Sequence, residues 1–331
     1  MSIASEIQRL QQAKADIYRA LSRRGIHIPS DSTVDEYAAI IDPITSGETI
    51  TYLDNPQGYL SFKFVTDGTV KWQNVKGDIE YSKNGGSTWT AFNGTTVSAT
   101  TGDEIWFKGS LTGGCGASSE SGSSKFYTSG YFFASGNIQS LCSFNNTLQG
   151  YHFAYLFSKC SSLNVDENNK LLLPATTLQS GCYNSMFRDC TSLTTAPKLP
   201  ATTLATYCYQ YMFYGCTSLT AAPELLATTL ADYCYQYMFY GCTSLTAAPE
   251  LPATTLQSGC YSYMFQGCKR LNYIKAMFTT TPSATYTSNW VNGVASSGTF
   301  VMNSAASWNT GTTSCSVSTY PCNWTVKTAA S

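Results

Sequence analysis

The chain has 331 residues, of which only 12% are charged, and its formal net charge at neutral pH is −1. Apart from Arg19, Arg23 and Arg24, its basic residues are thinly spread, which excludes the clustered positive surface that nucleic-acid binding requires. The length leaves room for two or three domains.

Residues 1–46 are predicted to be a helical module. Apolar residues recur there every three or four positions and form one narrow seam, which Gly25 and Pro29 end. A narrow seam suits a short coiled coil between chains, and packing on a second helix after Thr33 is the alternative. The segment has no continuous apolar core, so we expect neither a signal peptide nor a membrane span. The residues expected to mediate oligomerisation or attachment are Ile3, Ile7, Leu10, Ile17 and Leu21.

Residues 47–136 are predicted to form a β-sandwich that acts as a spacer. Apolar and polar residues alternate at 59–65 and 104–109, and turn signals occur at Asp67-Gly68 and Asn84-Gly85-Gly86. Residues 82–89 resemble the Asp-box hairpin of sialidases, with Asn84 where aspartate is usual. Because that hairpin is a structural turn and occurs here once, it does not indicate a glycosidase.

Residues 137–281 contain a repeat. The pattern Phe-x-x-Cys-x-x-Leu occurs five times, and the steps between its cysteines are 30, 26, 26 and 26 residues. Within one unit, Leu230, Cys234, Met238 and Cys242 are four apart, which we interpret as the apolar stripe of a helix, followed by a short strand that ends at proline. Repeats of this length predict a leucine-rich-repeat solenoid of five helix–turn–strand coils. The five motifs begin at Phe157, Phe187, Phe213, Phe239 and Phe265.

Residues 282–331 are predicted to form a β-rich C-terminal cap. The complete fold expected is therefore a multidomain α+β protein: helical module, β-sandwich, solenoid and cap. The repeat cysteines are explained by apolar packing, and the eight-residue separation of Cys208 and Cys216 does not suit paired zinc ligands. The state of Cys315 and Cys322, which could close a small loop, stays open at this stage.

The sequence indicates no enzyme. Its only histidines are His27 and His152, and it contains no phosphate-binding loop, no nucleophile elbow and no zinc-protease motif. No catalytic residue, cofactor or metal site is therefore assigned.

Tyrosines that lie outside the apolar stripe recur at equivalent positions of the units. Stacked coils would align them into ladders, and tyrosine offers a flat ring and a hydroxyl group at a low entropic cost, which suits glycan or protein surfaces. The alternative is that some of them fill gaps between coils, above all Tyr209, Tyr235 and Tyr261. The residues predicted to contact a ligand are Tyr211, Tyr214, Tyr237, Tyr240 and Tyr263.

Two segments resemble known families. The repeat unit with its trailing Leu-Pro is similar to the BspA-type leucine-rich repeats of bacterial and phage surface adhesins. The stretch IQRLQQAKADIYRAL through STVDEYAAIID resembles a short module at the start of phage tail and fibre proteins. These resemblances imply a fibre or adhesin of a Bacteroides-type phage virion.

The resemblances also imply partners. Such a subunit would be a homotrimer assembled in the host cytoplasm, attached to other virion proteins through residues 1–46, and would bind a host-surface glycan or protein. A head-decoration fibre and a bacterial cell-surface adhesin are the alternatives, and a depolymerase ranks third.

Overall fold

The computed structural model describes residues 55, 58–74, 77–111, 113–145, 147–165, 170–306 and 315–329. These residues belong to one compact unit, Leu53–Ser331. The predicted helical module at 1–46, including Ile3, Ile7, Leu10, Ile17 and Leu21, lies outside the described residues.

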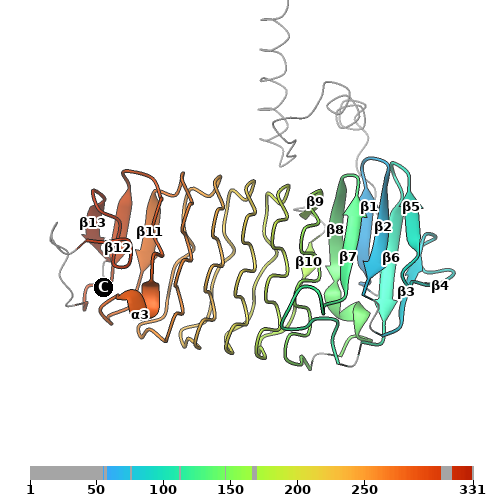
Figure 1. The fold of residues 1–331 in the computed structure, drawn as a ribbon, viewed down its shortest axis with the longest axis horizontal. Helices are drawn as coiled ribbons and strands as arrows, with labels where there is room; N and C mark the ends of the chain where they lie inside the picture. The colour runs from blue at the N-terminus through green and yellow to red at the C-terminus, as the bar shows by residue number, and fades with distance from the viewer. Residues whose placement is uncertain are drawn as a thin grey trace, which may run out of the picture. The chain divides into compact units, whose positions relative to one another are not determined.

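The unit begins with two sheets that face each other (Figure 1). The larger sheet has the order β10-β8-β1-β6-β3-β4, and β9 also pairs with β8; the smaller has the order β5-β2-β7. Pairing is antiparallel throughout, except that β9 and β10 run parallel to β8. The bounds are β1 Leu60–Phe64, β2 Gly68–Gln73, β3 Ile79–Ser82, β4 Thr90–Ala91, β5 Thr96–Ala99, β6 Glu104–Gly109, β7 Lys125–Ser129, β8 Phe132–Asn137, β9 Leu163–Val165 and β10 Leu171–Leu172, with a 3-10 helix η1 at Ile138–Leu141 after β8.

Aromatic side chains fill the space between the two sheets and join it to the repeats. The ring of Phe62 lies 4.7 Å from that of Phe107 and 4.8 Å from that of Phe126. Phe126 in turn stacks on Phe157, the first repeat phenylalanine, with 5.7 Å between ring centroids. Because this contact is buried, the sheets and the repeats share one continuous hydrophobic core.

Among the residues that the structure describes between 150 and 276, the repeat region contains no α-helix, so the predicted helix–turn–strand solenoid is wrong. Where helices were expected, the chain makes runs of consecutive tight turns, here called turn segments. A left-handed residue recurs every fourth position in them, as at Tyr207, Tyr211 and Gly215, where φ is 61°, 57° and 70°. An α-helix cannot contain such residues. The turn segments are residues 150–159, 180–189, 206–215, 232–241, 258–267 and 288–293.

Backbone hydrogen bonds explain how these turns stack. In the segment 206–215, the amides of Cys208, Gln210 and Met212 donate to the carbonyl three residues before them. The intervening amides donate to the next unit, as from Tyr209 to the Cys234 carbonyl at 3.0 Å and from Phe213 to the Met238 carbonyl at 2.9 Å. Each turn segment therefore closes its own turns and also binds its neighbour, which satisfies the buried polar backbone.

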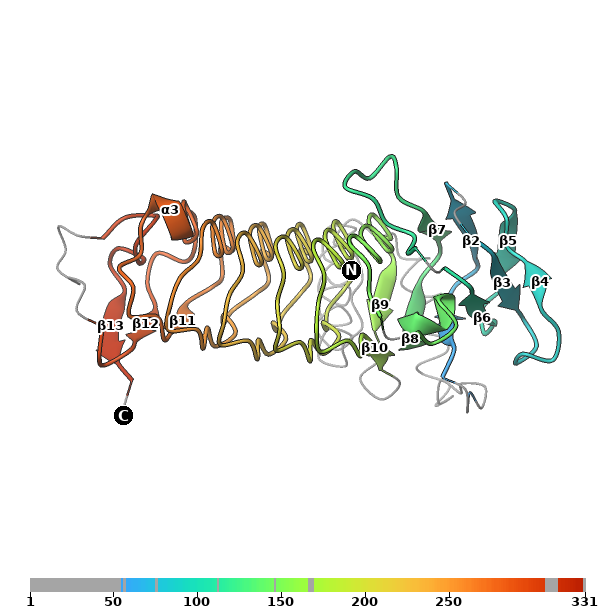
Figure 2. The ribbon, with the colours of Figure 1, turned by 90° about the horizontal axis from the view of Figure 1, so that it is seen from below.

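The side of each unit opposite its turn segment is extended but hardly forms strands. Neighbouring units meet there at isolated parallel bridges such as Thr195 with Ala221 and Ala247 with Tyr273. Figure 2 shows the turn segments along one side of the stack and these extended segments along the other. Prolines such as Pro197 and Pro223 interrupt the ladder, because proline has no amide hydrogen to donate.

The C-terminal part continues the same stack. A parallel sheet of the order β11-β12-β13 begins after the turn segment 258–267, and its strands are Tyr273–Ala276, Thr299–Met302 and Thr325–Thr328. The one α-helix among the described residues is α3, Ala284–Thr287. Cys315 and Cys322, whose state the sequence left open, form a disulfide. The described part of the chain is thus almost entirely strand and turn, and the predicted α+β class is wrong.

Candidate binding surface

The five tyrosines predicted to contact a ligand lie together on the outer side of the turn segments. Tyr211, Tyr237 and Tyr263 form one column, with nearly parallel rings whose centroids are 4.7 and 4.5 Å apart. Tyr214 and Tyr240 form a second column, with centroids 4.7 Å apart. The columns touch, since the centroids of Tyr211 and Tyr214 are separated by 5.8 Å. We call these five residues the tyrosine surface.

The backbone under the first column is strained. Tyr211, Tyr237 and Tyr263 have φ of 57°, 57° and 60°, in the left-handed region that glycine adopts readily and other residues rarely. Each such residue costs roughly 1–2 kcal/mol, and ring stacking returns energy of about the same size. The same conformation occurs at Tyr207 and Tyr233, so it belongs to the turn segments in general and does not by itself mark a binding site.

Two further side chains complete the tyrosine surface. Together with the five tyrosines, Arg188 and Gln266 line an open hollow of about 420 Å³. The guanidinium carbon of Arg188 lies 5.1 Å from the ring centroid of Tyr214 and 6.0 Å from that of Tyr211, a cation–π arrangement. Sequence reasoning missed Arg188, although the repeat register places it at the position of Tyr214 one unit earlier.

The arrangement determines which groups a ligand can reach. Because the rings within a column cover one another, the tyrosine surface presents ring edges and hydroxyl groups more than ring faces. Burial raises the pKa of Tyr237 to about 12 and also raises the pKa of Tyr211 and Tyr214. These phenols therefore remain protonated at neutral pH and can both donate and accept hydrogen bonds.

The pKa of Tyr263 shifts the other way. Hydrogen bonds with Ser288 and Asn289 lower it. Tyr263 is thereby tied to the next turn segment, which holds this end of the first column in place.

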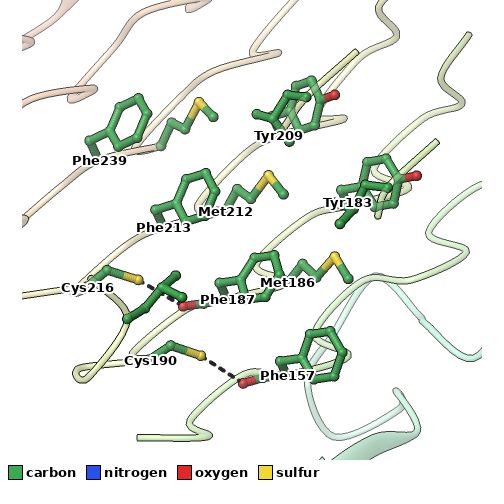
Figure 3. Close-up of a cluster of buried hydrophobic side chains, with 14 of the residues drawn as sticks. Phe157, Tyr183, Met186, Phe187, Cys190, Tyr209, Met212, Phe213, Cys216 and Phe239 are labelled. Carbon is green, nitrogen blue, oxygen red and sulfur yellow. Dashed lines mark hydrogen bonds between the residues drawn. The ribbon is translucent and has the colours of Figure 1, made fainter. Parts of the chain in front are cut away.

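Other tyrosines of the repeats serve packing. Tyr183, Tyr209, Tyr235 and Tyr261 are fully buried and stack at 5.8 to 5.9 Å along the interior, beside the phenylalanine column (Figure 3). The alternative considered for Tyr209, Tyr235 and Tyr261, that they fill the interior, is what the structure shows. Tyr207 and Tyr233 form a further half-buried pair outside the hollow, with centroids 5.2 Å apart.

Other kinds of site were sought among the described residues. No group of three or more His, Cys, Asp or Glu side chains within these ranges is placed to hold a metal ion. His152 is buried, and its Nδ1 accepts a hydrogen bond from the Gln149 amide at 3.0 Å. None of the helices in this part of the chain has the length and apolar character that crossing a bilayer would need.

Trp89, at the end of the Asp-box-like stretch 82–89, is half-buried. Its ring packs edge-on against Tyr59, with 5.0 Å between centroids, and the Lys108 ammonium lies 4.3 Å above it. It lies apart from the tyrosine surface and belongs to the surface packing of the larger sheet.

Comparison of the chain with protein-family models, with curated proteins and with solved structures finds no match.

Proposed function

We propose that the chain is a non-enzymatic binding subunit of a phage virion, a tail fibre or receptor-binding protein that contacts the bacterial surface through its tyrosine surface. The observation that carries the proposal is the convergence of five tyrosines in one open hollow on a rigid stack. Their rings are held in place by stacking, so little conformational entropy is lost when a ligand binds.

The phage setting rests on the resemblance of residues 1–46 to a module of tail and fibre proteins. In this setting residues 1–46 attach the subunit to other virion proteins, and the subunit is a homotrimer. Three copies of one tyrosine surface would raise the overall affinity through effective concentration, which suits repeated weak contacts with a cell surface.

The binding role is tested by changing Tyr211, Tyr237 and Tyr263 together to Ser in the full chain and measuring its adsorption to a panel of gut Bacteroides strains. We expect adsorption to fall to background. The matched control changes Tyr207 and Tyr233 to Ser, since that stacked pair lies on the same turn segments but outside the hollow. The control should adsorb normally and should report any loss of melting temperature caused by lost stacking. Undiminished adsorption by the folded triple variant would contradict the proposal.

The attachment role is tested separately. Deleting residues 1–46 should leave the rest of the chain folded, because residues 53–331 form one compact unit. The deletion should abolish incorporation into phage particles, measured as copy number by mass spectrometry of purified virions. Normal copy number for the shortened chain would place attachment elsewhere, and absence of the intact chain from virions would favour a cellular adhesin.

A further inference from the structure

A second hollow lies beside the tyrosine surface. It has a volume of about 540 Å³ and is lined by side chains of β2, β7, the loop before β7 and the first turn segment. The side chains that matter here are Glu120, Lys125, Tyr127 and Lys159. Tyr127 is 58% exposed, the most exposed of the large hydrophobic side chains in the described residues.

The two hollows lie on neighbouring, hydrogen-bonded segments. The amide of Lys159 donates to the carbonyl of Arg188 at 2.7 Å, so the last residue lining one hollow is bonded to the first residue lining the other. On the other side, the Phe126 amide donates to the Leu156 carbonyl at 3.0 Å, which joins β7 to the first turn segment in the same way. A single band therefore runs from Tyr127 on β7 to Gln266 on the fifth turn segment.

The length of the band follows from the spacing of its segments. It crosses β7 and five turn segments, and hydrogen-bonded neighbours of this kind are about 4.8 Å apart, so the five steps span roughly 24 Å. A site of this length suits an extended polymer more than a small molecule.

The part of the band nearest β7 is positively charged. The ammonium groups of Lys125 and Lys159 lie 2.5 and 3.0 Å from the two oxygens of Glu120, so one carboxylate is shared by two cations. Lys159 is 52% exposed, and two of its three donors remain available for a ligand beside the one used by Glu120.

Arg188 adds a third cation to the band. Its Nε is 3.4 Å from the Asp189 carboxylate, and its guanidinium carbon lies 5.1 Å from the ring centroid of Tyr214. Three cations thus face two carboxylates, which leaves one unit of positive charge in the part of the band nearest β7; the rest of the band is uncharged and aromatic.

We propose that this band, Tyr127 to Gln266, binds a linear acidic glycan, with Lys159 and Arg188 taking its carboxylate groups and the tyrosines on either side taking its hydroxyl groups. The inference rests on the proposed function and names its ligand class. The planar guanidinium of Arg188, placed 5.1 Å from the ring centroid of Tyr214, presents its donors in a fork that matches the two oxygens of a carboxylate. Tyr127 is 58% exposed, and its ring can pack on the apolar face of a sugar.

The test compares two polymers with the same sugar backbone, polygalacturonate and its fully methyl-esterified, uncharged form. Binding of the full chain to each is measured by biolayer interferometry. We expect the acid form to bind at least about tenfold more tightly than the ester, and the preference to shrink as sodium chloride is raised, because salt screens exposed charges.

Variants locate the contact. Lys159→Gln and Arg188→Gln should each weaken binding of the acid form by roughly three- to tenfold, and Tyr127→Ser should weaken binding of both forms. Lys275→Gln is the matched control, since Lys275 is a surface lysine paired with Glu250 at 2.9 Å and lies outside the band. Melting temperatures confirm that each variant is folded.

The outcomes separate this inference from the proposed function. Equal binding of the two polymers, binding of neither, or wild-type affinity in both charge variants would overturn the acidic ligand. Cell adsorption that survives the double variant Lys159→Gln/Arg188→Gln but is lost in the Tyr211/Tyr237/Tyr263 triple variant would leave the proposed function intact. Adsorption that survives both sets of changes would contradict both the acidic-glycan ligand and the proposed binding function.

Discussion

The thiol of Cys216 donates a hydrogen bond to the carbonyl oxygen of Phe187, in the preceding repeat unit, at 3.1 Å (Figure 3). The same carbonyl also accepts the amide hydrogen of Cys190, in its own unit, at 3.1 Å. The equivalent thiol bonds join Cys190 to Phe157, Cys242 to Phe213 and Cys268 to Phe239 at 3.0 to 3.1 Å. The spacing of phenylalanine and cysteine in the motif therefore has a physical cause: it closes a turn within one unit and ties that turn to the next.

Removing one of these thiols should weaken the stack. Cys216→Ala deletes a fully buried sulfur atom and one of the two hydrogen bonds to the Phe187 carbonyl. We expect the free energy of unfolding to fall by about 1–2 kcal/mol, measured by urea denaturation. Thr217→Ala, at the exposed neighbouring position, is the control and should change it by less than about 0.5 kcal/mol. A loss of similar size in both variants would show that the thiol hydrogen bond does not contribute to stability.

Phe213→Ala should be more damaging. Its ring is fully buried and stacks between those of Phe187 and Phe239, with centroids 5.6 Å away on each side. Removing the ring leaves a cavity in the middle of the column, because the hydrogen-bonded turn segments above and below hold their spacing. The expected loss is about 3–5 kcal/mol in the same urea experiment. A loss below about 1 kcal/mol would show that the column collapses around the gap.

Stability should decrease at alkaline pH. Burial raises the pKa of the Cys160 thiol to about 11 and those of Cys208 and Cys268 to about 12. In the unfolded chain these thiols ionise near pH 8.5, so the stability they contribute is fully present below that pH and is lost as pH rises towards 11–12. Each such thiol reduces the free energy of unfolding by about 1.4 kcal/mol per pH unit in this window. Urea midpoints that stay constant from pH 8 to pH 11 would contradict this account.

Thiol counting tests the cysteine assignment. Eleven of the 13 cysteines are buried free thiols, and the other two form the Cys315–Cys322 disulfide. The native protein should be almost unreactive towards a thiol reagent at pH 8, since the reactive thiolate is suppressed by burial. After unfolding without reductant the reagent should detect eleven thiols. Detection of thirteen thiols would show that Cys315 and Cys322 are not joined, and detection of nine or fewer would mean that repeat cysteines are paired.

The sequence predicted the tyrosine columns because it fixes the register of the units. Tyr211, Tyr237 and Tyr263 are 26 residues apart, and any regular stacking of units brings such residues together. Arg188 was missed because only its place in the register, and not its residue type, connects it to Tyr214. The identity of the ligand cannot be predicted in this way, because it does not follow from the repeat register.

The helix prediction was wrong for a reason that can be stated in terms of spacing. Residues four apart drift by about 40° per step around an α-helix of 3.6 residues per turn, so a strict period of four fits a helix only over a short distance. Four-residue turns repeat at a period of four without drift, and each places a left-handed residue at its end, as at Tyr237 and Gly241. The sequence favours both interpretations nearly equally over one unit.

Sequence alone determined which residues of neighbouring units face each other, and that the apolar residues of the motif are buried, because both follow from a repeat distance and from hydrophobicity. Only the tertiary structure decided the backbone conformation of the units, since the alternate amides of a turn segment are satisfied by carbonyls 25 residues later, as from Tyr211 to Gln236. The tertiary structure also decided the parallel pairing of β8 with β9 and β10, which joins the sheets to the repeats. The local sequence pattern does not predict contacts between such distant residues, because these contacts stabilise the chain only once the units have stacked.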